Sequence, residues 1–145
     1  KTGVEKISMN ADIQMVPMQE KHIPALAQLE RLCFSQPWTE SGLRSELHNK
    51  LAVFCVAEQN GQVLGYAGMQ CVMGECYINN IAVFPQFRGM GIGTRLVQML
   101  MEQAIQRDPW KYAFPINKPF LFIENLVFMK WAAEKIFIQR LWKMV

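Results

Sequence analysis

The chain has 145 residues, of which 51% are hydrophobic and 19% are charged, and its formal net charge is +3. A chain of this length forms one domain whose core needs no disulfide or metal to hold it. Its low charge and high apolar content exclude a disordered chain, and no apolar run reaches the roughly 20 residues of a membrane-spanning helix. The first residues lack the apolar stretch of a signal peptide.

The four cysteines form no C-x-x-C pair and have no histidine at metal-ligand spacing; they are Cys33, Cys55, Cys71 and Cys76. Cys55 and Cys71 lie inside apolar, strand-like runs. Such cysteines are typical of buried thiols in a reducing compartment. We therefore expect free core thiols, no metal site and a cytoplasmic protein.

The first predicted elements are a strand over residues 12–16 and two helices. Apolar residues at three-residue spacing indicate one face of the first helix: Ile23, Leu26, Leu29 and Leu32. Pro37 ends this unit. Thr39 then has the side chain to cap a short second helix that carries Leu43 and Leu47.

Three strands of a meander are predicted next, over residues 51–58, 63–72 and 76–84. Asn60-Gly61 joins the first two and is typical of a two-residue hairpin turn, in which both positions take positive φ. Residues 73–75 form the second turn. Pro85 ends the third strand because it removes a hydrogen-bond donor from the ladder.

A glycine-rich turn follows the third strand and leads into an amphipathic helix with apolar residues from Leu96 to Ala104. The turn reads Arg88-Gly89-Met90-Gly91-Ile92-Gly93-Thr94. The resulting order, β-α-α-β-β-β-α, predicts an α+β fold with a mostly antiparallel mixed sheet flanked by helices.

This turn has the features of a pyrophosphate site. The first turn of a helix presents free N–H groups and the positive end of the helix dipole, and glycine lets the backbone approach an anion closely. The spacing fails the dinucleotide pattern G-x-G-x-x-G, which would need glycine at Thr94 or Leu96, and no Gly-Lys-Ser/Thr follows as in a Walker loop. The alternative to a pyrophosphate site is a tight strand-to-helix turn that binds no ligand.

With Ile81-Ala82-Val83 on the preceding strand, the pattern R-x-x-G-x-G is similar to the acetyl-coenzyme A motif of the GNAT acetyltransferases. Over residues 11–107 the chain resembles one branch of that family, the bacterial ribosomal-protein-alanine N-acetyltransferases. The segment Cys33-Phe34-Ser35-Gln36-Pro37-Trp38-Thr39-Glu40-Ser41 carries the same resemblance. The GNAT fold is therefore expected.

The resemblance implies a site for acetyl coenzyme A as the acetyl donor. Ile81, Ala82 and Val83 would pair with the pantetheine arm like an added strand. The pyrophosphate would be held by the turn that Arg88 leads, through the backbone amides of Gly89, Met90, Gly91, Ile92, Gly93 and Thr94.

The resemblance also implies a protein acceptor, the N-terminus of a ribosomal protein. Pro37, Trp38 and the turn near Glu75 would border that N-terminus. The amine must lose a proton as it attacks the thioester, and in the family a tyrosine after the fifth strand protonates the departing thiolate. No catalytic acid or base is assigned, because no position of this chain matches those of the family.

Residues 108–145 depart from the family and from the rest of the chain. They hold six basic and three acidic residues, nine of the sixteen aromatic residues and no glycine. A basic segment can contact nucleic acid or a membrane, but these cations are spread over mostly apolar residues, and we expect neither partner. The family's next strand, L-E-V-R-x-S-N, and its helix, L-Y-x-K-x-G-F, are both missing.

A shifted reading frame accounts for this departure. Reading each codon as the last base of one residue and the first two bases of the next allows L-E-V-R-x-S-N-x-Q-A-L-x-L-Y-R-K-F-G-F over residues 109–128, and the Trp codon forces the glutamate. We therefore divide the domain into an acetyl-CoA-binding GNAT core, residues 1–107, and an aberrant tail, residues 108–145. The alternative is a genuine tail with a strand over 120–123 and a helix over 125–144.

The predicted function is acetyl-CoA-dependent acetylation of the N-terminal Ala of a ribosomal protein. Two other functions stay open: a catalytically silent acyl-CoA-binding module, and an acetyltransferase for small-molecule amines. His22 and His48 lie outside the motif and are expected on the surface.

Overall fold

The computed structural model describes residues 12–72, 75–107 and 136–138. Its elements are β1 (Gln14–Pro17), the 3-10 turn η1 (Glu20–His22), α2 (Ile23–Cys33), α3 (Glu40–Glu46), β2 (Ala52–Gln59), β3 (Gln62–Val72), β4 (Glu75–Val83), the 3-10 turn η2 (Pro85–Phe87), α4 (Ile92–Arg107) and β5 (Ile136–Ile138). The predicted order of elements up to α4 is confirmed.

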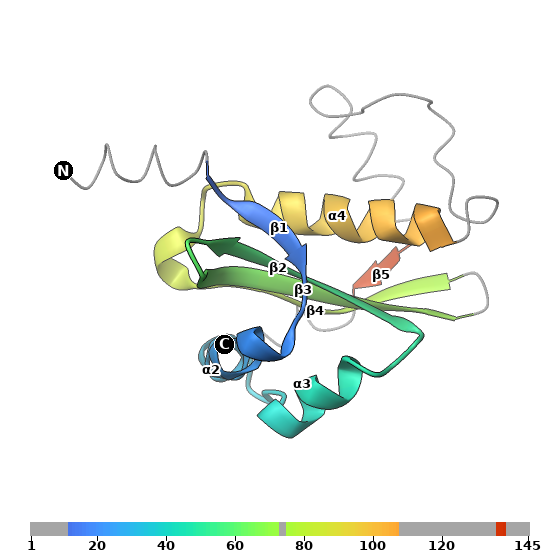
Figure 1. The fold of residues 1–145 in the computed structure, drawn as a ribbon, viewed down its shortest axis with the longest axis horizontal. Coiled ribbons are helices and arrows are strands. Elements are labelled where there is room, and N and C mark those ends of the chain that lie inside the picture. Colours follow the sequence, from blue (N-terminus) through green and yellow to red (C-terminus); the bar gives the residue numbers. More distant parts are fainter. Residues whose placement is uncertain (1–11, 73–74, 108–135, 139–145) are drawn as a thin grey trace.

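The five strands of the described residues form one mixed sheet in the order β1-β2-β3-β4-β5. β1 to β4 are antiparallel neighbours, and β5 lies parallel to β4. Figure 1 shows α4 on one face of this sheet, with α2 and α3 on the other. The predicted α+β fold with a mostly antiparallel sheet flanked by helices is confirmed.

The turn between β2 and β3 has the predicted geometry. Asn60 has φ of 50° and Gly61 has φ of 79°, and Gln59 pairs with Gln62 across the hairpin. Both central residues therefore take positive φ, as a twisted two-residue hairpin requires.

The core fills both faces of the sheet because side chains alternate along each strand. On one face Tyr66 is linked through Asn80 to α2, and on the other the Cys55 thiol contacts the Leu96 carbonyl of α4 at 3.6 Å. The largest fully buried side chains come from the helices and the sheet alike: Tyr66, Ile23, Leu26, Leu29, Leu43, Leu64, Met69, Ile78, Ile92, Leu96 and Leu100.

Helix α2 buries a different stripe from the predicted one. Leu32 is 52% exposed, whereas Glu30 is fully buried. At about 100° per residue, Leu32 lies on the opposite side of the helix from Ile23, and Glu30 lies on the same side as Ile23. Three-residue spacing drifts around a helix, so the prediction for Leu32 was wrong.

Helix α3 starts where the sequence indicates. The Thr39 hydroxyl accepts a hydrogen bond from the Gly42 amide at 3.1 Å, which caps the first turn. Leu43 is fully buried, and the helix ends at Glu46, so Leu47 lies just beyond it as the C-cap.

The prediction of a surface histidine fails at position 22. His48 is exposed, but His22 is only 2% exposed. Its Nδ1 accepts a hydrogen bond from the Gln19 amide at 3.0 Å, and its Nε2 lies 2.7 Å from the Glu58 carboxylate. The residue is buried because the surrounding backbone and Glu58 satisfy both ring nitrogens.

The prediction of four free thiols is also wrong. Cys71 and Cys76 are joined by a disulfide, whereas Cys33 and Cys55 are free and buried. Cys71 pairs with Cys76 across the β3–β4 hairpin, with 4.1 Å between their Cα atoms. A search for C-x-x-C spacing misses such a pair, because the hairpin brings together residues five apart.

Most of the segment predicted to be aberrant lies outside the described residues. Within it, Ile136–Ile138 form β5 and pair with Cys76, Tyr77 and Ile78 of β4. The helix proposed over residues 125–144 as an alternative is therefore wrong at these positions. No helix in the described part of the chain is long and apolar enough to cross a membrane.

Candidate functional site

The pairing of β4 changes along its length. The β3–β4 register shifts so that Gly68 faces Asn80 and Met69 faces Ile78, which leaves Asn79 as the extra residue of a bulge. Among the described strands, β5 follows β4 only up to Ile78. Beyond the bulge, residues 81–83 pair with β3 along one edge, and no described strand lies along the other edge.

The glycine turn connects this strand to α4 and is open. Gly89 has φ of 80° and Gly91 has φ of 78°, a backbone conformation that disfavours every residue with a side chain. A Cβ at Gly89, Gly91 or Gly93 would meet no atom within 4 Å. The Arg95 amide makes the first helical bond, to the Gly91 carbonyl at 3.1 Å. The amides of Ile92, Gly93 and Thr94 come before this bond, so they have no acceptor within the helix.

Arg88 ties the glycine turn to the open edge of β4 and to α2. Its Nε donates to the Val83 carbonyl at 3.0 Å, and its Nη2 donates to the Cys33 sulfur at 3.3 Å. Burial raises the pKa of the Cys33 thiol, and the Arg88 charge and hydrogen bond act in the opposite direction. The guanidinium keeps further N–H donors, because it has five in all.

The predicted acceptor segment lies against the face of the sheet that carries α2. Pro37 is exposed and Trp38 is half-buried. The Trp38 ring packs on Phe54, with centroids 6.1 Å apart and planes at 52°. Its backbone amide donates to Glu30 Oε1 at 2.8 Å.

Glu75 is the first residue of β4 and pairs with Val72. It lies at the opposite end of β4 from Val83. The structure therefore links Trp38, the edge formed by residues 81–83 and the glycine turn, but it does not bring Glu75 to them.

Sequence reasoning missed a buried polar group beside these elements. Glu30 Oε2 accepts from Asn80 Nδ2 at 3.3 Å, and the same nitrogen donates to Tyr66 Oη at 2.9 Å. Among the described buried side chains, Asn80 Oδ1 is the atom without a hydrogen-bond partner. A charged residue on the apolar side of a helix was the available signal, since Glu30 follows Leu26 by four residues.

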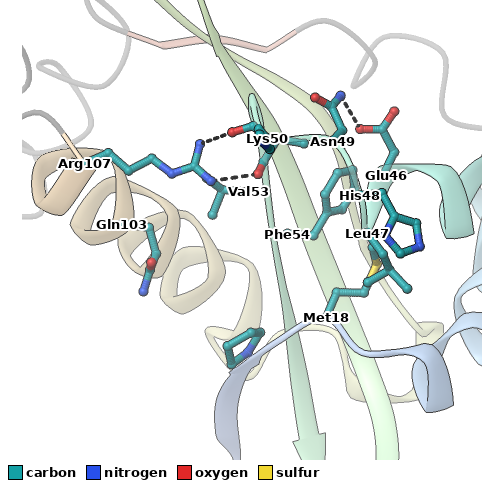
Figure 2. Close-up of a pocket in the computed structure, with 12 residues that line it drawn as sticks. Met18, Glu46, Leu47, His48, Asn49, Lys50, Val53, Phe54, Gln103 and Arg107 are labelled. Carbon is teal, nitrogen blue, oxygen red and sulfur yellow. Dashed lines mark hydrogen bonds between the residues drawn. The ribbon is translucent and has the colours of Figure 1, made fainter.

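A pocket of about 370 Å³ lies elsewhere, at the C-terminal end of α4. Figure 2 shows Arg107 and Gln103 on one side of it and the residues after α3 on the other. Arg107 donates to the carbonyls of Lys50 and Ala52 at 3.2 and 3.0 Å. None of the predicted site residues lines this pocket. In the described residues, no three His, Cys, Asp or Glu side chains gather as metal ligands.

Comparison with known families decides the relationship. The profile of the Acetyltransferase (GNAT) family matches residues 23–114, which include the acceptor segment, the open edge of β4 and the glycine turn. The chain belongs to the GNAT family. The resemblance inferred from the glycine motif is confirmed.

Individual GNAT proteins are similar over part of this chain. A Bacillus subtilis (strain 168) protein, provisionally named a ribosomal protein bS18-alanine N-acetyltransferase, is 33% identical over 101 residues, which are 69% of this chain and 67% of that protein. The crystal structure of the ribosomal-protein-S18-alanine N-acetyltransferase from Escherichia coli has a TM-score of 0.58 at 25% identity, and the match covers 66% of this chain and 61% of that one. The chain thus spans about two thirds of these relatives.

A solved structure of lower sequence identity shows the fold alone. The PaiA N-acetyltransferase from Thermoplasma acidophilum, solved in complex with coenzyme A, has a TM-score of 0.58 at 13% identity. The match covers 67% of this chain and 74% of that one.

Proposed function

We propose that the chain binds acetyl coenzyme A between the glycine turn and the open edge of β4, and that it transfers the acetyl group to the N-terminal Ala of a ribosomal protein. The donor site is inferred from the glycine turn, in which two glycines have positive φ. This turn lies beside a strand edge that no described strand covers. The names of the similar Bacillus and Escherichia proteins support the acceptor.

The residues present fit the coenzyme. The space beside Gly89, Gly91 and Gly93 is open, and the absence of side chains there would let an anion approach the backbone amides. The amides of residues 89–94 would donate to the pyrophosphate at the positive end of α4. Ile81, Ala82 and Val83 would exchange backbone hydrogen bonds with the amides of the pantetheine arm, as an added strand does.

On the acceptor side, Pro37 and Trp38 would border the peptide N-terminus beside the same edge of β4. When bound, the coenzyme supplies an acetyl thioester, which an unprotonated amine attacks. The described residues of the chain would bind and orient the two substrates.

The donor site is tested by Gly91→Val with Gly61→Val as its control. Both glycines have nearly the same positive φ, so both variants carry similar backbone strain, but only Gly91 borders the proposed anion site. We expect coenzyme A affinity, measured by calorimetry, to fall about tenfold or more in Gly91→Val, equivalent to about 1.4 kcal/mol or more, and to stay unchanged in Gly61→Val. Equal affinities in the two variants would reject the cradle.

The acceptor is tested by comparing a peptide that begins with Ala with polyamines and aminoglycosides, each with acetyl coenzyme A. Turnover of the peptide alone supports the proposal. Turnover of the small amines instead would make the chain a small-molecule acetyltransferase, and coenzyme binding without any turnover would make it a silent acyl-CoA-binding module.

A further inference from the structure

Glu30 is a buried carboxylate held between two parts of the proposed site. The residue is fully buried in α2. One oxygen accepts from the backbone amide of Trp38 at 2.8 Å, and the other accepts from the Asn80 side chain at 3.3 Å. Trp38 belongs to the acceptor segment, and Asn80 directly precedes the edge formed by residues 81–83.

Asn80 is oriented by this carboxylate. Its Nδ2 gives one hydrogen to Glu30 and the other to Tyr66 Oη, which leaves Oδ1 without a partner in the described structure. The opposite orientation of the amide would place Oδ1 against a carboxylate oxygen, where two acceptors repel. The bond to Glu30 is therefore kept at the cost of an unpaired buried oxygen.

These contacts are more specific than core packing requires. An apolar side chain of similar volume at position 30 could also pack α2 on the sheet. It would accept from neither the Trp38 amide nor Asn80, and both donors would lose this acceptor. The carboxylate therefore fixes the position of the acceptor segment relative to the β4 bulge.

We infer that Glu30 is a positioning residue, which acts with Asn80 to hold the Pro37–Trp38 segment in register with the coenzyme edge of β4. Glu30 touches neither substrate. Through it the acceptor amine is oriented toward the thioester. The inference deepens the proposed function and rests on it for the identity of the two ligands.

The test uses the full chain and three variants. Glu30→Met removes both hydrogen bonds at similar volume. The double variant Glu30→Gln/Asn80→Asp exchanges the carboxylate and the amide between the two positions. The amide at position 30 can then accept from the Trp38 backbone amide and donate to the carboxylate at position 80. Glu46→Met is the matched control. Glu46 is also a helical glutamate, the last residue of α3, and it accepts a hydrogen bond from the Asn49 side chain at 3.0 Å.

Two affinities are measured by calorimetry, that for coenzyme A and that for a peptide beginning with Ala in the presence of coenzyme A. In Glu30→Met we expect peptide affinity to fall about tenfold or more, with coenzyme A affinity within about twofold of the unmodified chain. Hydrogen exchange of the Trp38 amide, followed by NMR, becomes faster. The double variant restores both quantities, and Glu46→Met changes neither.

Parallel loss of both affinities in Glu30→Met, or unchanged Trp38 exchange, would leave Glu30 a structural residue and overturn the inference. So would a double variant that restores nothing. If the unmodified chain binds coenzyme A but no peptide, the proposed acceptor fails. Trp38 exchange then decides alone: faster exchange in Glu30→Met, reversed in the double variant, supports the positioning role, and unchanged exchange rejects it.

Discussion

Because Gly68 has no Cβ, the Phe54 ring can lie directly over β3 at this position. A Cβ at Gly68 would collide with three atoms of that ring, and Phe54 stacks on Tyr66 with centroids 6.2 Å apart. The packing of Phe54, which contacts Trp38 of the acceptor segment, therefore depends on a glycine at position 68.

The expected effect of Gly68→Ala is a loss of about 1–3 kcal/mol in the free energy of unfolding, because the buried ring has to shift. Gly42→Ala is the control: Gly42 lies in α3 with only the Thr39 hydroxyl near a new Cβ, at 3.5 Å. There alanine should stabilise the helix by about 0.5–1 kcal/mol. Urea denaturation measures both, and a stabilised Gly68→Ala chain would contradict the packing argument.

The free thiols should react slowly in the folded chain. Burial raises the pKa of Cys55 to about 12, so at pH 8 only about one thiol in ten thousand is the reactive thiolate. Burial raises the pKa of Cys33 as well. With the Cys71–Cys76 disulfide formed, a thiol reagent should label two cysteines in denaturant and almost none under native conditions. Fast native labelling of Cys55 would contradict its burial.

At the scale of single elements, strands and turns follow from local pattern. β-branched and aromatic runs predict β2 and β3, and Asn60-Gly61 predicts the turn between them, because each depends on residues adjacent in sequence. The hydrogen-bond partners of Glu30 and His22 could not be found this way. These partners, Asn80 and Glu58, lie far along the chain, and no local pattern indicates them.

Helix α3 can be tested by its cap. Thr39→Ala removes the oxygen that accepts from the Gly42 amide and should cost about 0.5–2 kcal/mol of stability. Thr39 also follows Trp38 directly, so the loss should increase hydrogen exchange over residues 38–43 more than over β2. Thr39→Ser, which keeps the hydroxyl, is the conservative control and should preserve both stability and exchange.

At the scale of the whole molecule, the composition of the chain changes after α4. Residues 108–145 hold nine of the sixteen aromatic residues and no glycine. The family profile ends at residue 114. In the shifted frame, residues 109–113 allow L-E-V-R, the beginning of the strand that the family has after this helix. These observations support our proposal that residues 108–145 are translated in a shifted frame.

Sequencing the encoding DNA from the codon of Ala104 to beyond that of Val145 tests this proposal directly. We expect one base gained or lost near the codon of Asp108. The chain translated in the restored frame should acetylate the Ala peptide, because it regains the segment in which the family carries its acid. The present chain should bind coenzyme A more weakly than the restored chain and acetylate the Ala peptide more slowly. A confirmed frame would make the tail genuine, and the pairing of Ile136–Ile138 with β4 would then be a feature particular to this chain.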